Sequence, residues 1–166
     1  MKTKNLTVLG VLLLFCAGVR AQEKVTVDRI APVSVRMGQS APLLIKLHVH
    51  PGFHINSNKP TTPELIPTQV SFTPPEDLAV AKVKYPPGEL KSFPFDPSTK
   101  LSVYSGDVAV HAVVLPMPKA GIGTYTVHAE LKYQACDNNA CYPPKRVPIA
   151  FDVRIGGSGR RSPHLH

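Results

Sequence analysis

The sequence predicts an all-β fold, an immunoglobulin-like antiparallel β-sandwich, and three observations support this prediction. Apolar and polar residues alternate with a period of two along several segments. Eighteen prolines in 166 residues, roughly twice the usual share, exclude long helices. Turn sequences rich in Pro, Gly, Asn and Asp separate the alternating segments. We therefore expect about seven to nine short strands, with a jelly roll or a barrel as the alternative architecture.

The first element, residues 1–21, is typical of a secretory signal peptide. Two lysines precede an apolar stretch, and small or modest residues occupy the −3 and −1 positions before Gln22. The apolar stretch is shorter than the roughly 20 residues of a membrane span, so no span is expected in the mature chain. Lipidation at Cys16 is disfavoured, because Phe15 stands where lipoprotein signals place a small residue.

The strands of the first half of the mature chain differ in how clearly they are patterned. Residues 43–50 alternate, with leucine, isoleucine and valine at 43, 45, 47 and 49 on one face and lysine and histidine at 46, 48 and 50 on the other. Weaker patterns predict strands near 24–30, 33–37, 68–73 and 79–85.

Three strongly alternating segments complete the predicted sandwich, at residues 108–114, 125–134 and 147–155. Each places an apolar residue at every second position, which is typical of a strand with one buried face. Residues 22–155 are long enough for one domain of ordinary size. Residues 156–166, rich in Gly, Ser and Arg, are predicted to be a flexible tail.

Charge and motif content narrow the possible functions. Removal of the signal peptide lowers the formal net charge from +8 to +5, and no stripe of basic and aromatic residues suggests a nucleic-acid partner. Signatures of hydrolases and nucleotide-binding proteins are missing, so neither chemistry nor any cofactor is expected.

His48, His50 and His54 could bind a metal, but ordinary surface histidines are favoured because no carboxylate or cysteine stands among them. No metal is expected.

Cys136 and Cys141 are the cysteine pair of the mature chain and stand on either side of an Asp-Asn-Asn turn sequence. Extending the preceding alternation places Tyr133 and Ala135 inward and Cys136 outward, unlike a cysteine buried for packing. A disulfide that closes a loop of about six residues stabilises the fold by only about 2 kcal/mol. Such a bond contributes little as a structural cross-link. An accessible sulfur with a nearby partner thiol suits thiol–disulfide exchange. From the residues alone, a structural bridge and an exchanging one are equally supported.

Three segments carry a resemblance to a known family. They are the cysteine motif with its flanks at 133–144, the segment 52–60 followed by 65–68, and, more weakly, 104–106. Together they resemble the amino-terminal periplasmic domain of the thiol:disulfide interchange protein DsbD, in the family's order and across most of residues 24–154.

The resemblance implies a function. The domain would relay reducing equivalents between thioredoxin-fold proteins, a donor and an acceptor, as a component of a protein-disulfide reductase system. It would do so in the periplasm, or as a secreted protein, after signal-peptide cleavage. By motif position, Cys141 would form the mixed disulfides and Cys136 would resolve them. Phe93 or Phe95 would lie on a cap loop that shields the disulfide, with core packing as the alternative.

The surroundings of the cysteines suggest how partners dock and how the thiols ionise. An apolar rim is offered by Tyr133, Tyr142, Pro143 and Pro144. Turn chemistry and the edge of the core are the equal alternative for these four residues. Modest lowering of the thiol pKa is expected from the nearby cations Lys132, Lys145 and Arg146. Asp137 would oppose them.

The chain departs from the family pattern in two ways. Four residues separate the cysteines, fewer than in well-known members, and Ala140 replaces the bulky aromatic residue that precedes the second cysteine. Neither a transmembrane segment nor a thioredoxin-like domain follows, so we expect a stand-alone copy that a separate protein recharges. The alternative function is a secreted binding or adhesion β-sandwich whose disulfide is permanent.

Overall fold

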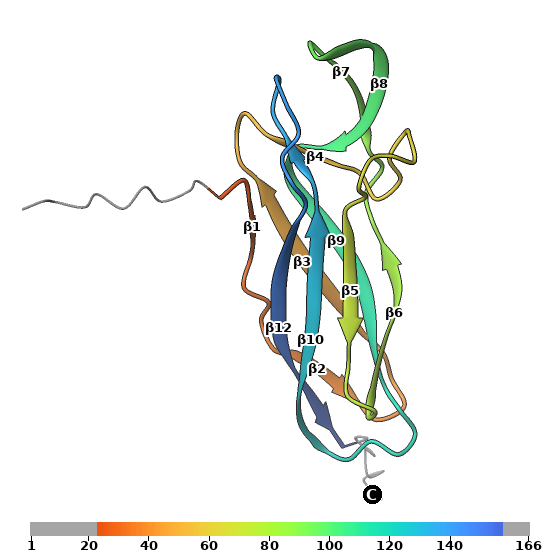
Figure 1. The fold of residues 1–166 in the computed structure, drawn as a ribbon. Helices are drawn as coiled ribbons and strands as arrows, with labels where there is room; N and C mark the ends of the chain where they lie inside the picture. Colours follow the sequence, from red (N-terminus) through yellow and green to blue (C-terminus); the bar gives the residue numbers. More distant parts are fainter. Residues whose placement is uncertain (1–22, 158–166) are drawn as a thin grey trace, which may run out of the picture.

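The computed structural model describes residues 23–157, which form strands, turns and loops (Figure 1). The predicted signal peptide and most of the predicted tail lie outside the described residues. The strands are β1 (Val25–Val27), β2 (Val33–Arg36), β3 (Ala41–Val49), β4 (His54–Asn56), β5 (Gln69–Thr73), β6 (Leu78–Lys84), β7 (Glu89–Phe93), β8 (Asp96–Tyr104), β9 (Gly106–Pro116), β10 (Gly123–Tyr133), β11 (Ala135–Cys136) and β12 (Lys145–Gly156). Within residues 23–157, no helix is long and apolar enough to cross a membrane.

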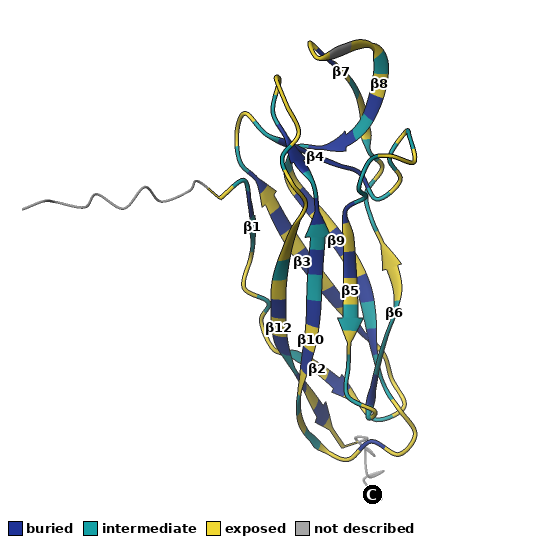
Figure 2. Ribbon diagram, viewed as in Figure 1, coloured by how far each residue is buried: buried dark blue, intermediate teal, exposed yellow. Residues whose placement is uncertain are grey.

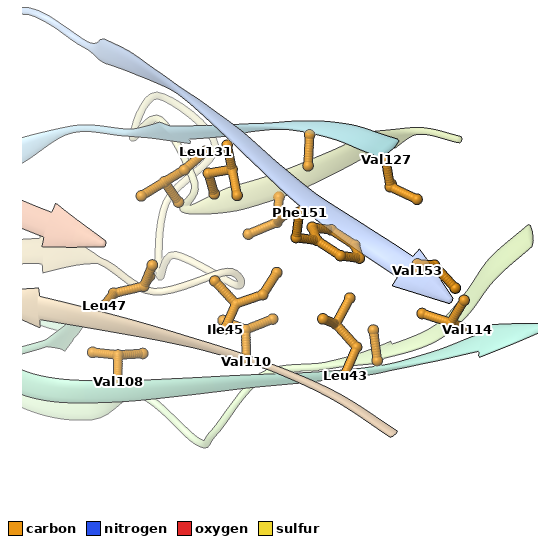
Figure 3. Close-up of a cluster of buried hydrophobic side chains, with 14 of the residues drawn as sticks. Leu43, Ile45, Leu47, Val108, Val110, Val114, Val127, Leu131, Phe151 and Val153 are labelled. Atoms are coloured by element: carbon orange, nitrogen blue, oxygen red, sulfur yellow. The ribbon is translucent and has the colours of Figure 1, made fainter. Parts of the chain in front are cut away.

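Two four-stranded sheets form the body of the sandwich, in the orders β1-β3-β9-β6 and β2-β12-β10-β5. Their inner faces pack against each other and enclose one apolar core, in which Ile45 and Val110 of the first sheet face Leu131 and Phe151 of the second (Figure 3). Each buried side chain of this size contributes about 1.5–3 kcal/mol to folding. This arrangement confirms the predicted all-β, immunoglobulin-like sandwich. One pairing is parallel rather than antiparallel, that of β2 with β12 at the sheet edge.

The strongly patterned segments all form strands, and the burial of their residues follows the predicted alternation. β3 is buried at every second residue from Ala41 to Val49, and β9, β10 and β12 repeat this pattern (Figure 2). The weaker predictions correspond to β1, β2, β5 and β6, with ends shifted by at most three residues. β12 continues through Gly156, one residue into the predicted tail.

A third sheet, in the order β11-β4-β8-β7, covers one end of the sandwich (Figure 1). We call it the end sheet. The sequence analysis did not predict any of its strands. Gly52, with a φ of 85°, makes the turn that leads the chain from β3 into β4. The end sheet has its own small apolar cluster of Phe93, Leu101 and Val103. Buried polar residues lie in β4 of this sheet and in the loop that follows it, namely His54, Asn56, Ser57 and Thr68.

Candidate functional site

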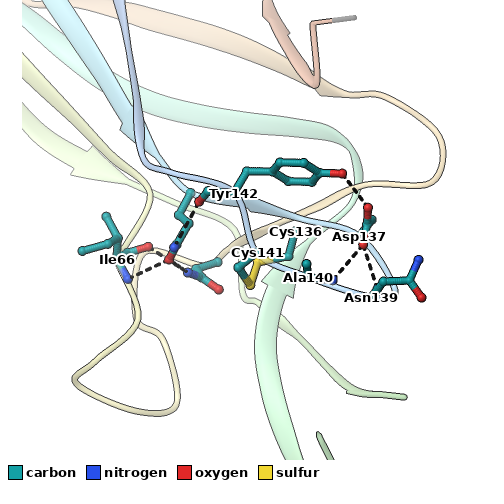
Figure 4. Close-up of a disulfide and its surroundings, with 9 residues drawn as sticks. Ile66, Cys136, Asp137, Asn139, Ala140, Cys141 and Tyr142 are labelled. Carbon is teal, nitrogen blue, oxygen red and sulfur yellow. Dashed lines mark hydrogen bonds between the residues drawn. A yellow bond between two sulfur atoms is a disulfide. The ribbon is translucent and has the colours of Figure 1, made fainter. Parts of the chain in front are cut away.

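The two cysteines face each other across a tight hairpin that follows β11. The amide of Asp137 donates to the carbonyl of Ala140 at 2.9 Å, and the amide of Tyr142 donates to the carbonyl of Ala135 at 2.8 Å. These bonds flank Cys136 and Cys141, whose Cα atoms lie 3.9 Å apart and whose sulfurs form a disulfide (Figure 4). Side chains of such a non-hydrogen-bonded antiparallel pair project from the same face of the sheet. The hairpin itself therefore brings the two sulfurs together.

The Asp137 carboxylate fixes the turn between the cysteines. Its Oδ1 accepts from the amides of Asn139 at 2.7 Å and Ala140 at 2.9 Å, and its Oδ2 accepts from the Tyr142 hydroxyl at 2.6 Å (Figure 4). The Tyr142 bond, with the two amide bonds, holds the pKa of Asp137 below its usual value. The same carboxylate raises the pKa of the Tyr142 hydroxyl.

The two cysteines differ sharply in exposure. Cys136 is 0% exposed, whereas Cys141 is exposed. The sequence-based prediction that Cys136 points outward is wrong, because the alternation of β10 stops at Tyr133. After Gln134 the chain joins the end sheet, where Cys136 pairs with His54 of β4. An incoming thiol can therefore reach the disulfide at Cys141.

A polar network holds the base of the hairpin. The Gln134 Oε1 accepts from the Asn56 Nδ2 at 3.2 Å and from the Ile66 amide at 3.4 Å. Its Nε2 donates to the carbonyl of Tyr142 at 3.2 Å. Asn56 also donates to the carbonyl of Ile66 at 3.0 Å. The sequence analysis assigned no role to Asn56 or Gln134. Both residues lie inside the segments that carry the family resemblance, and this position was the only feature of the sequence that could have indicated a role for them.

His54 occupies the buried side of the disulfide. It is 4% exposed, and its ring stacks on that of Phe93 with 3.9 Å between the ring centroids. Burial is the main cause that lowers the pKa of His54 to about 4. The positive charge of Lys91 lowers this pKa further, and the negative charge of Asp137 raises it. At neutral pH the His54 imidazole is therefore uncharged.

The predicted cap residues lie next to His54. Phe93 is buried in the end-sheet cluster, as core packing would require, and Phe95 is 41% exposed and stacks on Phe93 with 5.5 Å between the centroids. Phe93, His54 and Asn138 of the cysteine turn line one cavity. The aromatic pair therefore stands close to the disulfide hairpin on its His54 side.

The three histidines that the sequence analysis considered as metal ligands line one cavity but differ in their contacts. The Nδ1 of His48 lies 2.5 Å from the Oδ1 of Asp107 on an exposed face, and its ring meets that of His50 edge-on. His54 is buried within the end sheet, as the first residue of β4. Among residues 23–157, no group of three or more His, Cys, Asp and Glu residues could hold a metal ion.

The predicted docking rim is only partly on the surface. Tyr142, Pro143 and Pro144 line a second cavity beside the hairpin, together with Lys24. The Lys24 ammonium lies 3.9 Å from the centroid of the Tyr142 ring. Tyr133 lines the same cavity but is only 1% exposed. Of the two roles expected for Tyr133, the structure therefore supports the edge of the core and not the exposed rim.

The three cations that lie near the cysteines in the sequence belong to strands β10 and β12 of the sandwich. Arg146 forms an ion pair with Glu130 of β10. Lys132 and Lys145 lie in the register of the β10–β12 pair, opposite Arg146 and Tyr133 respectively. The charges that shift the pKa of His54, behind burial itself, are those of Lys91 and Asp137.

A β-sandwich whose disulfide has one exposed and one buried cysteine offers another protein's thiol one accessible end of the bond, as thiol–disulfide exchange requires. The family comparison identifies which such domain it is. The family model "Thiol:disulfide interchange protein DsbD, N-terminal" matches residues 21–152, and the chain belongs to this family. The predictions of the family and of thiol–disulfide exchange are thereby confirmed.

Several solved structures are similar to parts of this chain at low identity. The reduced Neisseria meningitidis DsbD N-terminal domain is 24% identical, with a TM-score of 0.41 over 68% of this chain and 75% of its own. The same domain in complex with the PilB N-terminal domain is 20% identical, with a TM-score of 0.42 over 66% of this chain and 73% of its own. A ScaB type I cohesin of Pseudobacteroides cellulosolvens is 12% identical, with a TM-score of 0.51 over 86% of this chain and 98% of its own. The N-terminal periplasmic domain of Proteus mirabilis ScsB is 13% identical, with a TM-score of 0.49 over 79% of this chain and 47% of its own. No curated protein matches.

Proposed function

We propose that this domain is a periplasmic electron relay in which Cys141 exchanges with partner proteins and Cys136 resolves the mixed disulfides. The observation that carries the proposal is the difference in exposure between the two cysteines of one disulfide. Attack at an exposed sulfur needs little rearrangement of the fold, whereas attack at the buried sulfur would require the end sheet to open. The cysteine that is attacked first is therefore Cys141.

The relay runs in two half-reactions that balance. The thiolate of a reducing partner attacks the Cys141 sulfur, and the electron pair of the broken S–S bond passes to the Cys136 sulfur. The partner's second thiol then attacks the mixed disulfide, which leaves the partner oxidised and this domain with two thiols. In the second half-reaction, Cys141 attacks the disulfide of the accepting partner, and Cys136 releases it by reforming the Cys136–Cys141 bond. Two electrons pass, and sulfur atoms carry all the chemistry.

The partners in this proposal are thioredoxin-fold proteins on both sides of the relay. Membership of the DsbD N-terminal family supports this assignment. The Neisseria meningitidis member has been solved in complex with the PilB N-terminal domain. The apolar surface formed by Tyr142, Pro143 and Pro144 beside the exposed sulfur is the proposed docking rim. Phe95, stacked on Phe93, is the proposed cap.

The proposed location is the periplasm, reached after cleavage of residues 1–21. The family supports a periplasmic domain, and the similar ScsB domain is described as periplasmic. The basic and apolar composition of residues 1–21 supports the cleavage. Mass spectrometry of the exported protein should give a mature N-terminus at Gln22; an uncleaved N-terminus would contradict this part of the proposal.

The experiment that tests the relay is trapping of mixed disulfides in cells. Cys136→Ala leaves Cys141 without its resolving partner, so covalent complexes with thioredoxin-fold proteins should accumulate and disappear under reducing conditions. Cys141→Ala is the matched control, and it should trap little because its remaining sulfur is buried. Trapping by Cys141→Ala alone would reverse the two roles. Absence of complexes in both variants would support a permanent disulfide in a binding module.

A further inference from the structure

His54, Cys136 and Cys141 form a row across three neighbouring chain segments. Cys136 pairs in register with His54 of β4 on one side and with Cys141 on the other. Directly opposed residues of an antiparallel pair project from the same face, with Cβ atoms about 4.5–5.5 Å apart. The His54 imidazole is therefore within side-chain reach of the buried sulfur, on the side away from the exposed one.

The Nε2 nitrogen of His54 has no hydrogen-bond partner in the oxidised protein. Nε2 is buried, and the ring that carries it is held by its stack on Phe93. Buried polar atoms are normally hydrogen-bonded, and leaving one without a partner costs free energy. The sulfurs of a disulfide are weak acceptors and have no hydrogen to donate. The oxidised state therefore leaves this nitrogen unsatisfied.

We propose that His54 is the hydrogen-bond partner of the Cys136 sulfur in the reduced protein and thereby favours the dithiol state. This inference rests on the proposed function, because it requires the Cys136–Cys141 disulfide to open. On reduction, the Cys136 sulfur receives the electron pair of the broken S–S bond. As a thiolate it accepts from Nε2–H, and once protonated by the reductant's thiol proton it donates S–H to a bare Nε2. Either tautomer of the ring gains a partner only on reduction.

The charges around the ring suit this role. Lys91 of β7 lowers the pKa of His54 and Asp137 of the turn between the cysteines raises it, and Lys91 is itself paired with Glu89 at 2.6 Å. His50 lines the same cavity from the other side of the Pro51–Gly52 turn. Burial keeps the ring uncharged at neutral pH, so its bond to Cys136 requires no second buried charge. The ring can therefore serve both the thiol and the thiolate.

The test compares reduction equilibria with a small dithiol, such as dithiothreitol, in the wild type and in His54→Phe. Phenylalanine keeps the stack on Phe93 but cannot bond to sulfur. The variant should be about tenfold harder to reduce, which corresponds to about 30 mV for a two-electron couple. His128→Phe, on the exposed face of β10, is the matched control and should keep the wild-type value. His54→Gln, whose amide can bond to sulfur, should recover most of the loss.

A second measurement needs no substitution. The NMR shift of the His54 Nε2 nitrogen should change when the wild-type protein is reduced, because the nitrogen gains a partner. Equal reduction equilibria for His54→Phe and wild type, or an unchanged Nε2 shift, would overturn the inference. Because the dithiol replaces the protein partner, these results are independent of the trapping experiment. Trapping by Cys136→Ala together with an unshifted His54→Phe equilibrium would leave the relay in place and remove only the role of His54.

Discussion

The sandwich and the end sheet are held together by different interactions. Between the two large sheets the core consists of aliphatic and aromatic side chains that alternate along long strands. Around the disulfide, buried polar groups replace them, and Asn56 and Gln134 tie β4, the following loop and the hairpin into one network. Apolar burial is non-directional, whereas each hydrogen bond fixes a position. The sandwich therefore supplies stability, and the end sheet supplies the geometry that buries one sulfur and exposes the other.

This division of roles predicts that stability and redox behaviour can be changed separately. A fully buried side chain contributes about 1.5–3 kcal/mol through area alone, while an intramolecular hydrogen bond contributes about 0.5–1.5 kcal/mol net. Changes in the sandwich should lower the free energy of unfolding with little effect on the disulfide. At neutral pH, changes beside the hairpin should alter the dithiol–disulfide equilibrium more than the free energy of unfolding.

The largest effect on stability is expected from Phe151→Ala in β12. Phe151 is buried at the centre of the sandwich (Figure 3), and its truncation leaves a cavity between the sheets. We expect the free energy of unfolding of the oxidised protein to fall by about 3–5 kcal/mol, measured by denaturant titration. The dithiol–disulfide equilibrium, measured on the fraction that stays folded, should match the wild type. A loss below about 1 kcal/mol would contradict the assignment of this core.

The next largest effect is a loss of stability in mild acid that depends on His54. Its pKa falls from 6.5 to about 4 on folding, so between these values the unfolded chain binds a proton that the folded protein excludes. The free energy of unfolding should therefore decrease as the pH falls from 6.5 to 4, by about 3 kcal/mol for this group. The wild-type curve minus that of His54→Gln isolates the effect. Parallel curves for the two proteins would contradict the buried, neutral imidazole.

Reduction of the disulfide should have a smaller effect. The bond closes a loop of about six residues, for which the loop-entropy relation gives about 2 kcal/mol. The reduced domain should therefore stay folded, with a free energy of unfolding lower by this amount in denaturant titrations at one pH. Unfolding on reduction would mean that the bridge is a structural staple and would contradict a relay.

How well each region could be predicted from the sequence follows the same division. The alternation of β3, β9, β10 and β12 predicts the sandwich because each of these strands is long and buries one face. β4 and β11 are too short for any period to show, and all residues of both are buried. Their pairing joins residues about eighty positions apart, which no local pattern indicates.

The burial of Cys136 shows the limit of pattern reasoning at the site. Alternation predicts the face of a residue only while the strand stays in one sheet. At Gln134 the chain passes from the sandwich to the end sheet, and the parity is lost. The turn sequence and the closeness of the two cysteines were predicted from local residues, and the hairpin contains both. The polar network and the place of His54 required the long-range pairing of β4 with β11.

The smallest effect is expected at Asp137, whose carboxylate is on the surface of the hairpin. Its pKa is lowered by the Tyr142 hydroxyl and by the amides of Asn139 and Ala140, so its stabilising effect is present above the ordinary carboxyl pKa. That effect should disappear as the pH falls through the lowered value. Carboxyl NMR should show Asp137 titrating below 3.8, the ordinary value for aspartate.

In Asp137→Asn the turn loses the charge that orders it. Hydrogen exchange of the Asn139 and Ala140 amides should accelerate severalfold at neutral pH, because the neutral amide oxygen is a weaker acceptor than the carboxylate. Asp152→Asn is the matched control, since Asp152 accepts from Thr126 on the outer face of the sandwich, and it should leave the hairpin amides unchanged. Global stability should change little in either variant, because both carboxylates are exposed to solvent. Unchanged exchange in Asp137→Asn would mean that the two backbone hydrogen bonds of the hairpin order the turn without the carboxylate.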